Sequence, residues 1–317
     1  MYEQFYGLAD RPFDLTPNPK YLFLTPSHRE ALSSLEYGIS ARTGVTVLIG
    51  EAGTGKTTLI RATLEGRDPD KTKAIYMNNP TLSRSEFLEF LAGEFGLPSE
   101  LASSKTRLLK ELEVALVDLH NERITPALII DEAQSLPHEL LEEIRLLANI
   151  ETMQDKLLPI VLAGQPELAE RLNHPSLRQL KQRVGLRCQL RQLDLGETGA
   201  YITARIAVAG GQASTVFTRE AVMIVHERSQ GIPRLVSVIC HNALISGFAL
   251  NQRPITASVV REVCEDFDLN NADGMTLLPR LTPTAPTSEP APPVPPRGVR
   301  RELFSGLPRP KRGFSFF

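Results

Sequence analysis

The residues best suited to chemistry form the glycine-rich segment Gly50-Glu-Ala-Gly-Thr-Gly-Lys56-Thr57. It fits GxxxxGK[ST] at every fixed position, between an apolar run and a helical pattern, which is the context this motif requires. Its glycines let backbone N–H groups point at phosphate oxygens, while the lysine reaches the β and γ phosphates and the threonine hydroxyl reaches Mg²⁺. The predicted nucleotide-binding residues are Gly50, Glu51, Ala52, Gly53, Thr54, Gly55, Lys56, Thr57 and Thr58.

Two carboxylates, Asp131 and Glu132, follow the apolar run Ala-Leu-Ile-Ile. The carboxyl end of a parallel strand beside a phosphate loop is where Mg²⁺ must be held, so we expect Asp131 to bind the metal together with Thr57. Glu132 is then placed to polarise the attacking water. Alone, such an acidic pair is also typical of a capped turn. The phosphate loop upstream favours the interpretation that this pair binds the metal and activates water.

Three further polar residues are candidates for the same site. Gln165 ends the next apolar run and could either orient water near the γ-phosphate or cap a helix through the turn Gln-Pro-Glu. Arg183 and Arg234 are candidates for stabilising charge on the γ-phosphate, and an arginine supplied by a neighbouring subunit contributes about 10³–10⁵ in rate. Most arginines are solvated surface residues, so spacing alone leaves both roles open.

Short β-branched runs alternate with helical patterns before residue 193, and this alternation predicts a parallel sheet covered by helices on both faces. The predicted strands are 45–49, 73–77, 127–130, 159–163 and 185–190. Beyond that point only helical patterns follow, at 196–209, 218–229, 232–250 and 256–266. The fold class is therefore α/β, with a P-loop NTPase sheet followed by a small all-helical lid.

Four segments are expected along the chain. Residues 1–26, rich in aromatics and proline, form an extended arm packed on the core, and residues 27–192 form the α/β nucleotide-binding domain. Residues 193–270 form the helical lid domain. Residues 271–317 form a basic, proline-rich disordered tail, because ten of the 24 prolines lie between Met275 and Phe317.

Charge divides the chain at the same place. Residues 275–317 carry seven Lys/Arg and two Asp/Glu, so the net charge of −2 leaves −7 for residues 1–274. A body of that sign argues against sequence-blind coating of nucleic acid, although a local basic stripe would still permit DNA binding. Three cysteines without metal-ligand spacing argue against a disulfide scaffold or a zinc site. No apolar run reaches the length of a transmembrane segment, so we expect a cytoplasmic protein.

Several short motifs together resemble an AAA+ ATPase of the ExeA-like family, the general secretion pathway A type with Orc1/Cdc6-related AAA domains. The resemblance covers about residues 1–268. It is carried by Phe5-Tyr-Gly-Leu8, Pro12-Phe13, Pro17-Asn-Pro19, Ser27-His-Arg-Glu-Ala-Leu32, Tyr37-Gly38, Asp131-Glu-Ala-Gln134, Arg145-Leu-Leu-Ala-Asn149, Gly164-Gln-Pro-Glu-Leu168 and Gly231-Ile-Pro-Arg234.

The resemblance implies a role for each matching residue. Lys56 with Thr57 looks like the Walker A pair, and Asp131 with Glu132 looks like the Walker B pair. Gln165 corresponds to sensor 1, and Arg234 corresponds to the sensor-2 arginine that reports on the γ-phosphate from the helical lid. Arg183 looks like the arginine finger supplied in trans, with Arg178 as the alternative.

The resemblance also implies a function. We expect Mg²⁺-dependent binding and hydrolysis of ATP by a homo-oligomer, a ring or a filament, that drives or regulates assembly of a secretion, pilus or exopolysaccharide envelope system. Secretion members of the family tend to continue into a transmembrane segment and a peptidoglycan-binding domain, where this sequence has its tail. The alternatives are a DNA-binding ATPase of the transposition-helper type and a slow nucleotide-gated interaction switch.

The tail has two interpretations of equal weight. Its proline run 290–296 favours polyproline II conformation, and the basic stretch after it ends in Gly-Phe-Ser-Phe-Phe317. It could be a linker with a docking peptide for a partner or for peripheral contact with the inner membrane. It could equally be an unselected extension.

Overall fold

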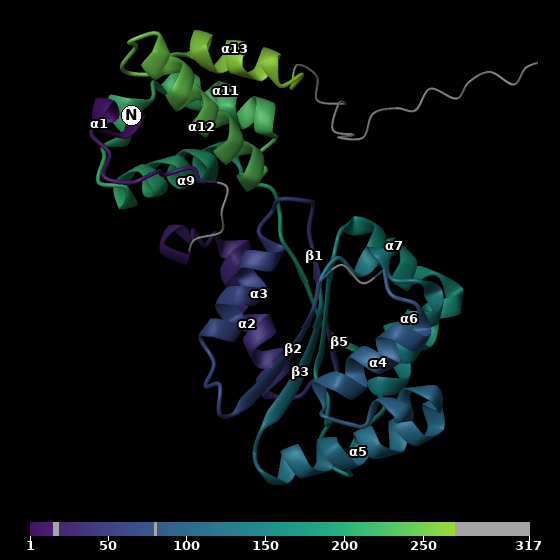
Figure 1. Cartoon of the computed structure of the whole chain (residues 1–317). Coiled ribbons are helices and arrows are strands. Elements are labelled where there is room, and N and C mark those ends of the chain that lie inside the picture. Colours follow the sequence, from purple (N-terminus) through teal and green to yellow (C-terminus); the bar gives the residue numbers. More distant parts are fainter. Residues whose placement is uncertain (15–18, 79–80, 270–317) are drawn as a thin grey trace, which may run out of the picture. The chain divides into compact units, whose positions relative to one another are not determined.

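The computed structural model describes residues 1–14, 19–78 and 81–269 (Figure 1). Five strands lie side by side in the order β2-β3-β4-β1-β5, and every neighbouring pair is parallel. The strands are β1 (Val45–Ile49), β2 (Thr72–Met77), β3 (Thr125–Ile130), β4 (Ile160–Gly164) and β5 (Val184–Gln189). The predicted α/β parallel sheet is confirmed.

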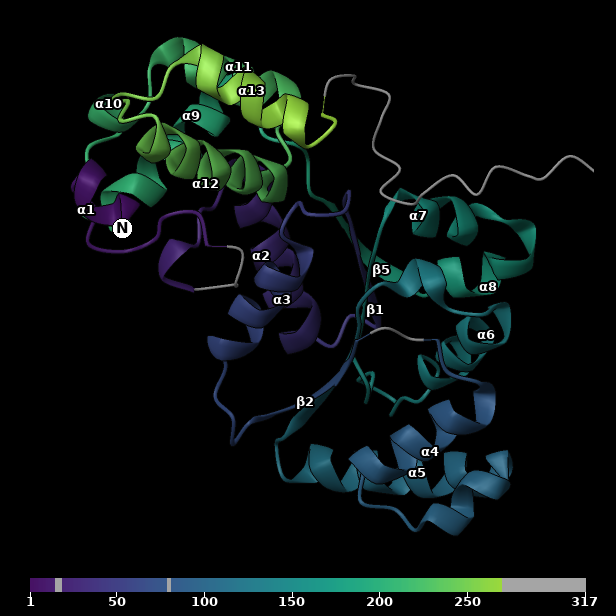
Figure 2. The same ribbon diagram turned by 45° about the horizontal axis from the view of Figure 1, so that its top comes forward.

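Helices cover both faces of this sheet (Figures 1 and 2). One face carries α2 (Pro26–Ser40) and α3 (Lys56–Glu65). The other face carries α4 (Arg84–Glu94), α5 (Lys105–Asn121), α6 (His138–Leu147), α7 (Pro166–Asn173) and the short α8 (Arg178–Lys181). Single 3-10 turns occur at Pro19–Tyr21, Ser99–Ser103, Ala133–Ser135 and Pro175–Leu177.

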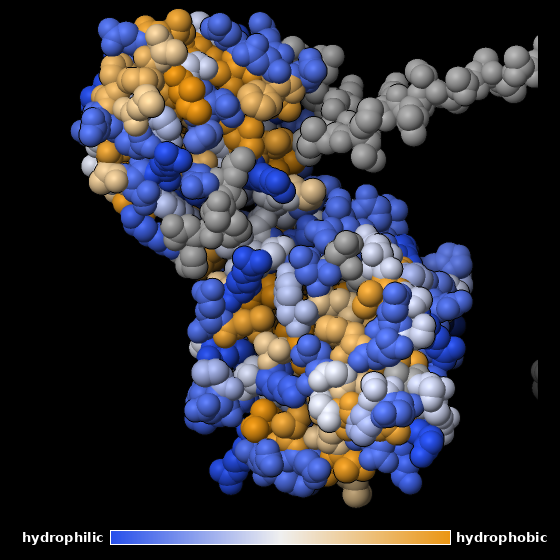
Figure 3. Space-filling view, viewed as in Figure 1, coloured by the Kyte–Doolittle hydropathy of each residue, from blue (hydrophilic) through white to orange (hydrophobic). Residues whose placement is uncertain are grey.

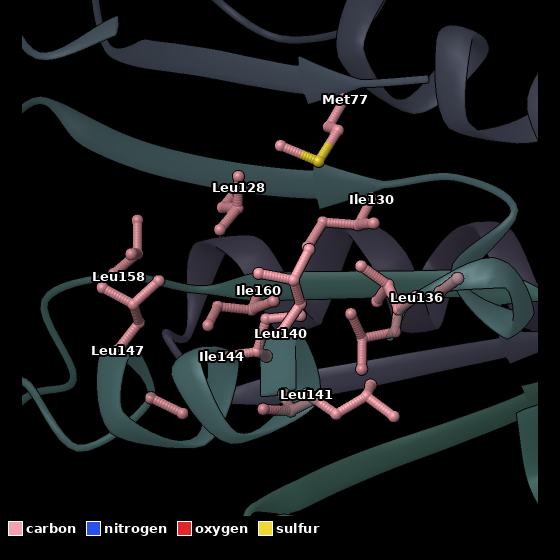
Figure 4. Close-up of a cluster of buried hydrophobic side chains, with 14 of the residues drawn as sticks. Met77, Leu128, Ile130, Leu136, Leu140, Leu141, Ile144, Leu147, Leu158 and Ile160 are labelled. Atoms are coloured by element: carbon pink, nitrogen blue, oxygen red, sulfur yellow. The ribbon is translucent and has the colours of Figure 1, made fainter. Parts of the chain in front are cut away.

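The central strands are buried on both faces, which explains their continuous apolar runs. Along β1 the side chains of Val45, Val47 and Ile49 join the apolar cluster under α4 to α8, whereas Leu48 joins the cluster under α2 and α3. Figure 4 shows part of the first cluster, where Leu140 and Ile144 of α6 lie over the strands. This packing fixes the strand ends from which the polar site residues project.

The region after β5 is helical, as predicted, with a core of its own. Its helices are α9 (Leu195–Val208), α10 (Ala213–Val216), α11 (Arg219–Ser229), α12 (Pro233–Ala249) and α13 (Ala257–Asp266). A capping box between Asp194 and Glu197 starts α9, and the Thr218 side chain caps α11. Pro233 occupies the first turn of α12, where a missing N–H costs nothing.

The first residues, expected as an extended arm packed on the core, include a short helix. Residues Tyr2–Tyr6 form a short helix, α1, and its two buried tyrosines join the apolar core of the helical region. Phe13 and Tyr21 belong to the same core. The physical reason is the i, i+4 spacing of the two tyrosines, which places both rings on one side of a helical turn.

Phe13 offers a direct test of this packing. Its side chain is fully buried, with an edge-on ring contact to Phe217 at 6.3 Å between centroids. We expect Phe13→Ala to lower the free energy of unfolding by about 3–5 kcal/mol, because it leaves a cavity in the helical core. The same change at the exposed Phe267 should cost less than about 1 kcal/mol in urea unfolding. Equal costs would contradict an integral role for the N-terminal residues.

Exposed large apolar side chains occur on both the α/β region and the helical region. In Figure 3 hydrophilic residues surround the apolar areas on the visible face of the α/β region. Among the described residues, no helix combines the length and the apolar character needed to cross a lipid bilayer.

Both interpretations of the tail concern residues 271–317, which lie outside the described residues.

Candidate functional site

The phosphate loop joins β1 to α3 and lies at the carboxyl edge of the sheet. Gly53 and Gly55 have φ angles of 82° and 100°, which side-chain-bearing residues rarely adopt. At Gly50 a Cβ would lie 2.7 Å from the Thr54 hydroxyl, so the first glycine is required by close packing. The three glycines therefore set the shape of the loop.

Lys56 begins α3 and is buried, with 5% of its surface exposed. Its Nζ donates hydrogen bonds to the carbonyl oxygens of Gly50 at 2.8 Å and Glu51 at 3.1 Å. Burial lowers the pKa of Lys56, and the carboxylates of Glu132 and Asp131 oppose that shift. The ammonium group thus lies within the loop, near both acidic residues.

Asp131 and Thr57 meet directly, as expected for a shared metal site. The Thr57 hydroxyl donates to Oδ2 of Asp131 at 2.6 Å, and this carboxylate is 1% exposed. The described residues include no group of three or more metal-ligating side chains. A magnesium ion in a nucleotide site takes one or two protein ligands, with phosphates and water completing its shell. The hydroxyl and carboxylate fit that ion.

Tyr76 is a site residue that the sequence did not indicate. It precedes the last residue of β2, and its hydroxyl donates to Oδ2 of Asp131 at 2.9 Å. Burial raises the pKa of Tyr76, and the negative charge of Asp131 raises it further, so the phenol stays protonated and remains a donor. The sequence feature that could have identified Tyr76 is its position near the end of β2, the strand that pairs with β3.

Glu132 is held by amide side chains. Its backbone φ of 53° lies in the left-handed region, and Nε2 of Gln134 donates to its Oε2 at 2.6 Å. Nε2 of Gln165 lies 3.5 Å from the same oxygen, at the limit of a hydrogen bond. Oε1 of Gln134 accepts the backbone N–H of Gln165 at 3.1 Å. Gln134, which ends the motif Asp131-Glu-Ala-Gln134 but was assigned no role from sequence, therefore joins the ends of β3 and β4.

Gln165 occupies the N-cap position of α7, but its side chain makes no capping hydrogen bond. The side chain instead lies toward Glu132. The geometry therefore disfavours the helix-capping interpretation of Gln165. Its sensor role stays a prediction.

Arg234 contacts the phosphate loop from the start of α12. Its backbone N–H donates to the Gly53 carbonyl at 3.2 Å, and a Cβ at Gly53 would lie 2.8 Å from the Arg234 Cβ. Glycine at position 53 therefore allows the helical region to approach the loop. This arrangement places Arg234 beside the phosphate loop.

Arg183 and Arg178 lie elsewhere. Arg183 directly precedes β5, and its carbonyl accepts the N–H of Val45, the first residue of β1. The phosphate loop follows the other end of β1, about 16 Å away at about 3.3 Å per residue. Both arginines are exposed. The fold therefore does not bring Arg183 to the nucleotide site of its own chain.

A cavity of about 460 Å³ opens over the phosphate loop. It is lined by candidate site residues from the sequence analysis, including Lys56, Thr57, Glu132 and Arg234. Other lining residues were not predicted: His28, Tyr21, Leu22, Phe23, Tyr201 and Arg205. The Arg205 guanidinium lies 4.9 Å from the Tyr21 ring centroid and 5.2 Å from that of Tyr201. For Tyr21 and Phe23 the sequence signal was the aromatic-rich N-terminal segment.

The sequence matches one family model and a known secretion protein. Residues 40–172 match the model of the family described as AAA domain. General secretion pathway protein A of Aeromonas hydrophila is 41% identical over 255 residues, which are 80% of this chain and 46% of that protein. The chain thus spans less than half of this relative.

Solved structures share the fold at low identity. Drosophila ORC bound to DNA has a TM-score of 0.62 and 19% identity, covering 84% of this chain and 66% of that one. Cdc6p of Pyrobaculum aerophilum has a TM-score of 0.61 and 16% identity, covering 82% of this chain and 71% of that one.

Proposed function

We propose that this chain, which belongs to the AAA+ ATPases and is related to general secretion pathway protein A, binds ATP with Mg²⁺ and hydrolyses it to ADP and phosphate. One observation carries the proposal. Lys56, Thr57 and Glu132 line one cavity, and Asp131 accepts a hydrogen bond from the Thr57 hydroxyl. Phosphate binding, metal binding and activation of water need these groups together.

The proposed roles follow from the chemistry of each group. Lys56 and the loop N–H groups bind the β and γ phosphates, and Arg234 contacts the γ-phosphate from α12. Thr57 and Asp131 hold the metal ion, and Tyr76 orients the Asp131 carboxylate. When bound, Mg²⁺ neutralises phosphate charge as the bond to the leaving group breaks.

Glu132 accepts the proton of the attacking water in this proposal. Gln134 restrains its carboxylate at Oε2, and among the described residues no donor occupies Oε1. A general base contributes about 10²–10⁴ in rate when it is correctly positioned. Gln165 orients the same carboxylate or the water beside it.

Lys56→Ala tests nucleotide binding. We expect it to weaken ATP binding about 10- to 100-fold, since charge-assisted hydrogen bonds to phosphate are lost, and to abolish turnover at cellular ATP concentrations. Titration with a fluorescent ATP analogue measures the affinity. Lys71→Ala is the matched control, since 75% of the Lys71 side chain is exposed. It should leave ATP affinity and turnover unchanged. Unaltered affinity in Lys56→Ala would contradict the proposed site.

We further propose that the enzyme works as an oligomer in the assembly of a secretion or related envelope system at the cytoplasmic side of the inner membrane. The support is the identity with a general secretion pathway protein and the position of Arg183, remote from its own site. Affinity capture with the Glu132→Gln variant as bait, in the presence of ATP, identifies the proteins that bind this chain. Recovery of envelope components supports the proposal, whereas stimulation of the ATPase by duplex DNA would favour the DNA-binding alternative.

A further inference from the structure

We infer that His28 is a positioning residue that fixes the peptide between Thr54 and Gly55 so that the phosphate loop is shaped for a polyphosphate before it binds. This inference rests on the proposed ATP-binding function. His28 lies in the first turn of α2, far in sequence from the loop, and 6% of its surface is exposed. Its Nε2 lies 3.0 Å from the carbonyl oxygen of Thr54.

The carbonyl oxygen of Thr54 can only accept, so Nε2 of His28 must carry the proton, and the hydroxyl of Thr25 complements that tautomer at Nδ1. Oγ1 of Thr25 accepts the backbone N–H of His28 at 3.3 Å as the helix cap, and it lies 2.6 Å from Nδ1 of the same residue. Burial lowers the pKa of His28, so the ring is neutral at pH 7. A neutral ring that must donate at Nε2 accepts at Nδ1, from the Thr25 hydroxyl.

Fixing the Thr54 carbonyl also fixes the N–H of Gly55. The peptide is planar and trans, so these two groups point in opposite directions. With the carbonyl held toward α2, the N–H is directed to the opposite side of the loop, where phosphate oxygens are expected. Gly55 has a φ of 100°, and a glycine-rich backbone has many alternative conformations. A hydrogen bond from outside the loop limits those alternatives before binding.

Nucleotide affinity in His28 variants tests the inference. We expect His28→Leu to weaken ATP binding about 5- to 30-fold, because a buried carbonyl loses its donor and the loop loses its restraint. His28→Gln places an amide N–H near the position of Nε2 and should stay within about threefold of the unmodified chain. Inorganic tripolyphosphate should lose as much affinity as ATP in His28→Leu, and adenosine should lose none.

His226 provides a matched control, since its Nδ1 lies 2.9 Å from the Thr198 hydroxyl, in the helical region. His226→Leu removes a comparable pair without touching the loop and should leave ATP binding unchanged. If His28→Leu does not fold, variants of Thr25 test the inference instead. Thr25→Val should weaken ATP binding several-fold. Thr25→Ser keeps the hydroxyl and should leave ATP binding unchanged.

Three results would overturn the inference. They are unchanged ATP affinity in His28→Leu, failure of His28→Gln to restore a lost affinity, and an equal loss for adenosine and tripolyphosphate, which would mean direct contact with the nucleoside. If the unmodified chain does not bind ATP, the proposed function itself fails. The two failures are therefore distinguishable.

Discussion

Glu132→Gln is expected to bind ATP within about threefold of the unmodified chain and to lose about 10²–10⁴ in kcat. The amide keeps the size of the side chain but cannot accept a proton from water. Binding depends on the loop and on Lys56, which this substitution leaves in place. Phosphate release under saturating ATP measures kcat, and titration with a fluorescent analogue measures affinity.

Glu167 provides the control for this substitution. It is an exposed glutamate in the first turn of α7, and its charge also acts on Lys56. Glu167→Gln removes the same charge near the cavity and should leave kcat within about twofold, since exposed charges contribute little. If Glu132→Gln kept full turnover, another group would have to be the general base. If Glu132→Gln lost ATP binding as well, Glu132 would be needed for the shape of the site.

Arg183→Ala is expected to lower kcat by about 10³–10⁵, the contribution of an arginine supplied to a neighbour's γ-phosphate. ATP binding by the single chain should be unchanged, because Arg183 lies at the amino edge of the sheet, beside the start of β1. The rate per protomer of the unmodified chain should fall on dilution as the oligomer dissociates. Steady-state turnover over a wide range of protein concentration measures both effects.

Mixing two inactive variants separates action in trans from a structural role. Arg183→Ala keeps Lys56, and Lys56→Ala keeps Arg183, so a mixed oligomer contains sites with both residues intact. We expect the mixture to recover part of the activity. Arg178→Ala, at the alternative arginine, should have a much smaller effect. Absence of recovery, together with a rate per protomer that is constant on dilution, would exclude Arg183 as an arginine finger.

Local sequence was sufficient for the order of elements and for much of the site. The strand β1 and the helix α3 follow from an apolar run, a glycine-rich turn and a helical pattern that adjoin in the chain. Because parallel strands end at one edge of a sheet, the ends of β3 and β4 could be placed beside the loop without coordinates. The Thr57 contact with Asp131 confirms their predicted proximity.

Local sequence was insufficient where a residue acts through a specific side-chain contact. Tyr76, Gln134 and His28 are ordinary polar residues in their own segments. Each becomes a site residue only through a contact with Asp131, Glu132 or Thr54. Such contacts depend on side-chain direction and on strand order, which local patterns do not encode.

The N-terminal residues show the same limit. Their aromatic and proline content predicts packing onto the core but does not say onto which part of it. Tyr2, Tyr6 and Phe13 lie in the core of the helical region, where they fill space between helices. Composition indicates that apolar rings will be buried, whereas the complementary surface is defined only after the helices have packed.

The sequence by itself determined the α/β class, the phosphate loop and the acidic pair, because each depends on residues adjacent in the chain and on backbone rules common to all proteins. Only the tertiary structure decided which amides hold Glu132, that the Tyr76 hydroxyl also meets Asp131, which histidine meets the loop and how far Arg183 lies from it. Except for the contact of Gln134 with Glu132, two residues away, those contacts join segments separated by tens of residues. Their geometry is set by close packing of the whole core.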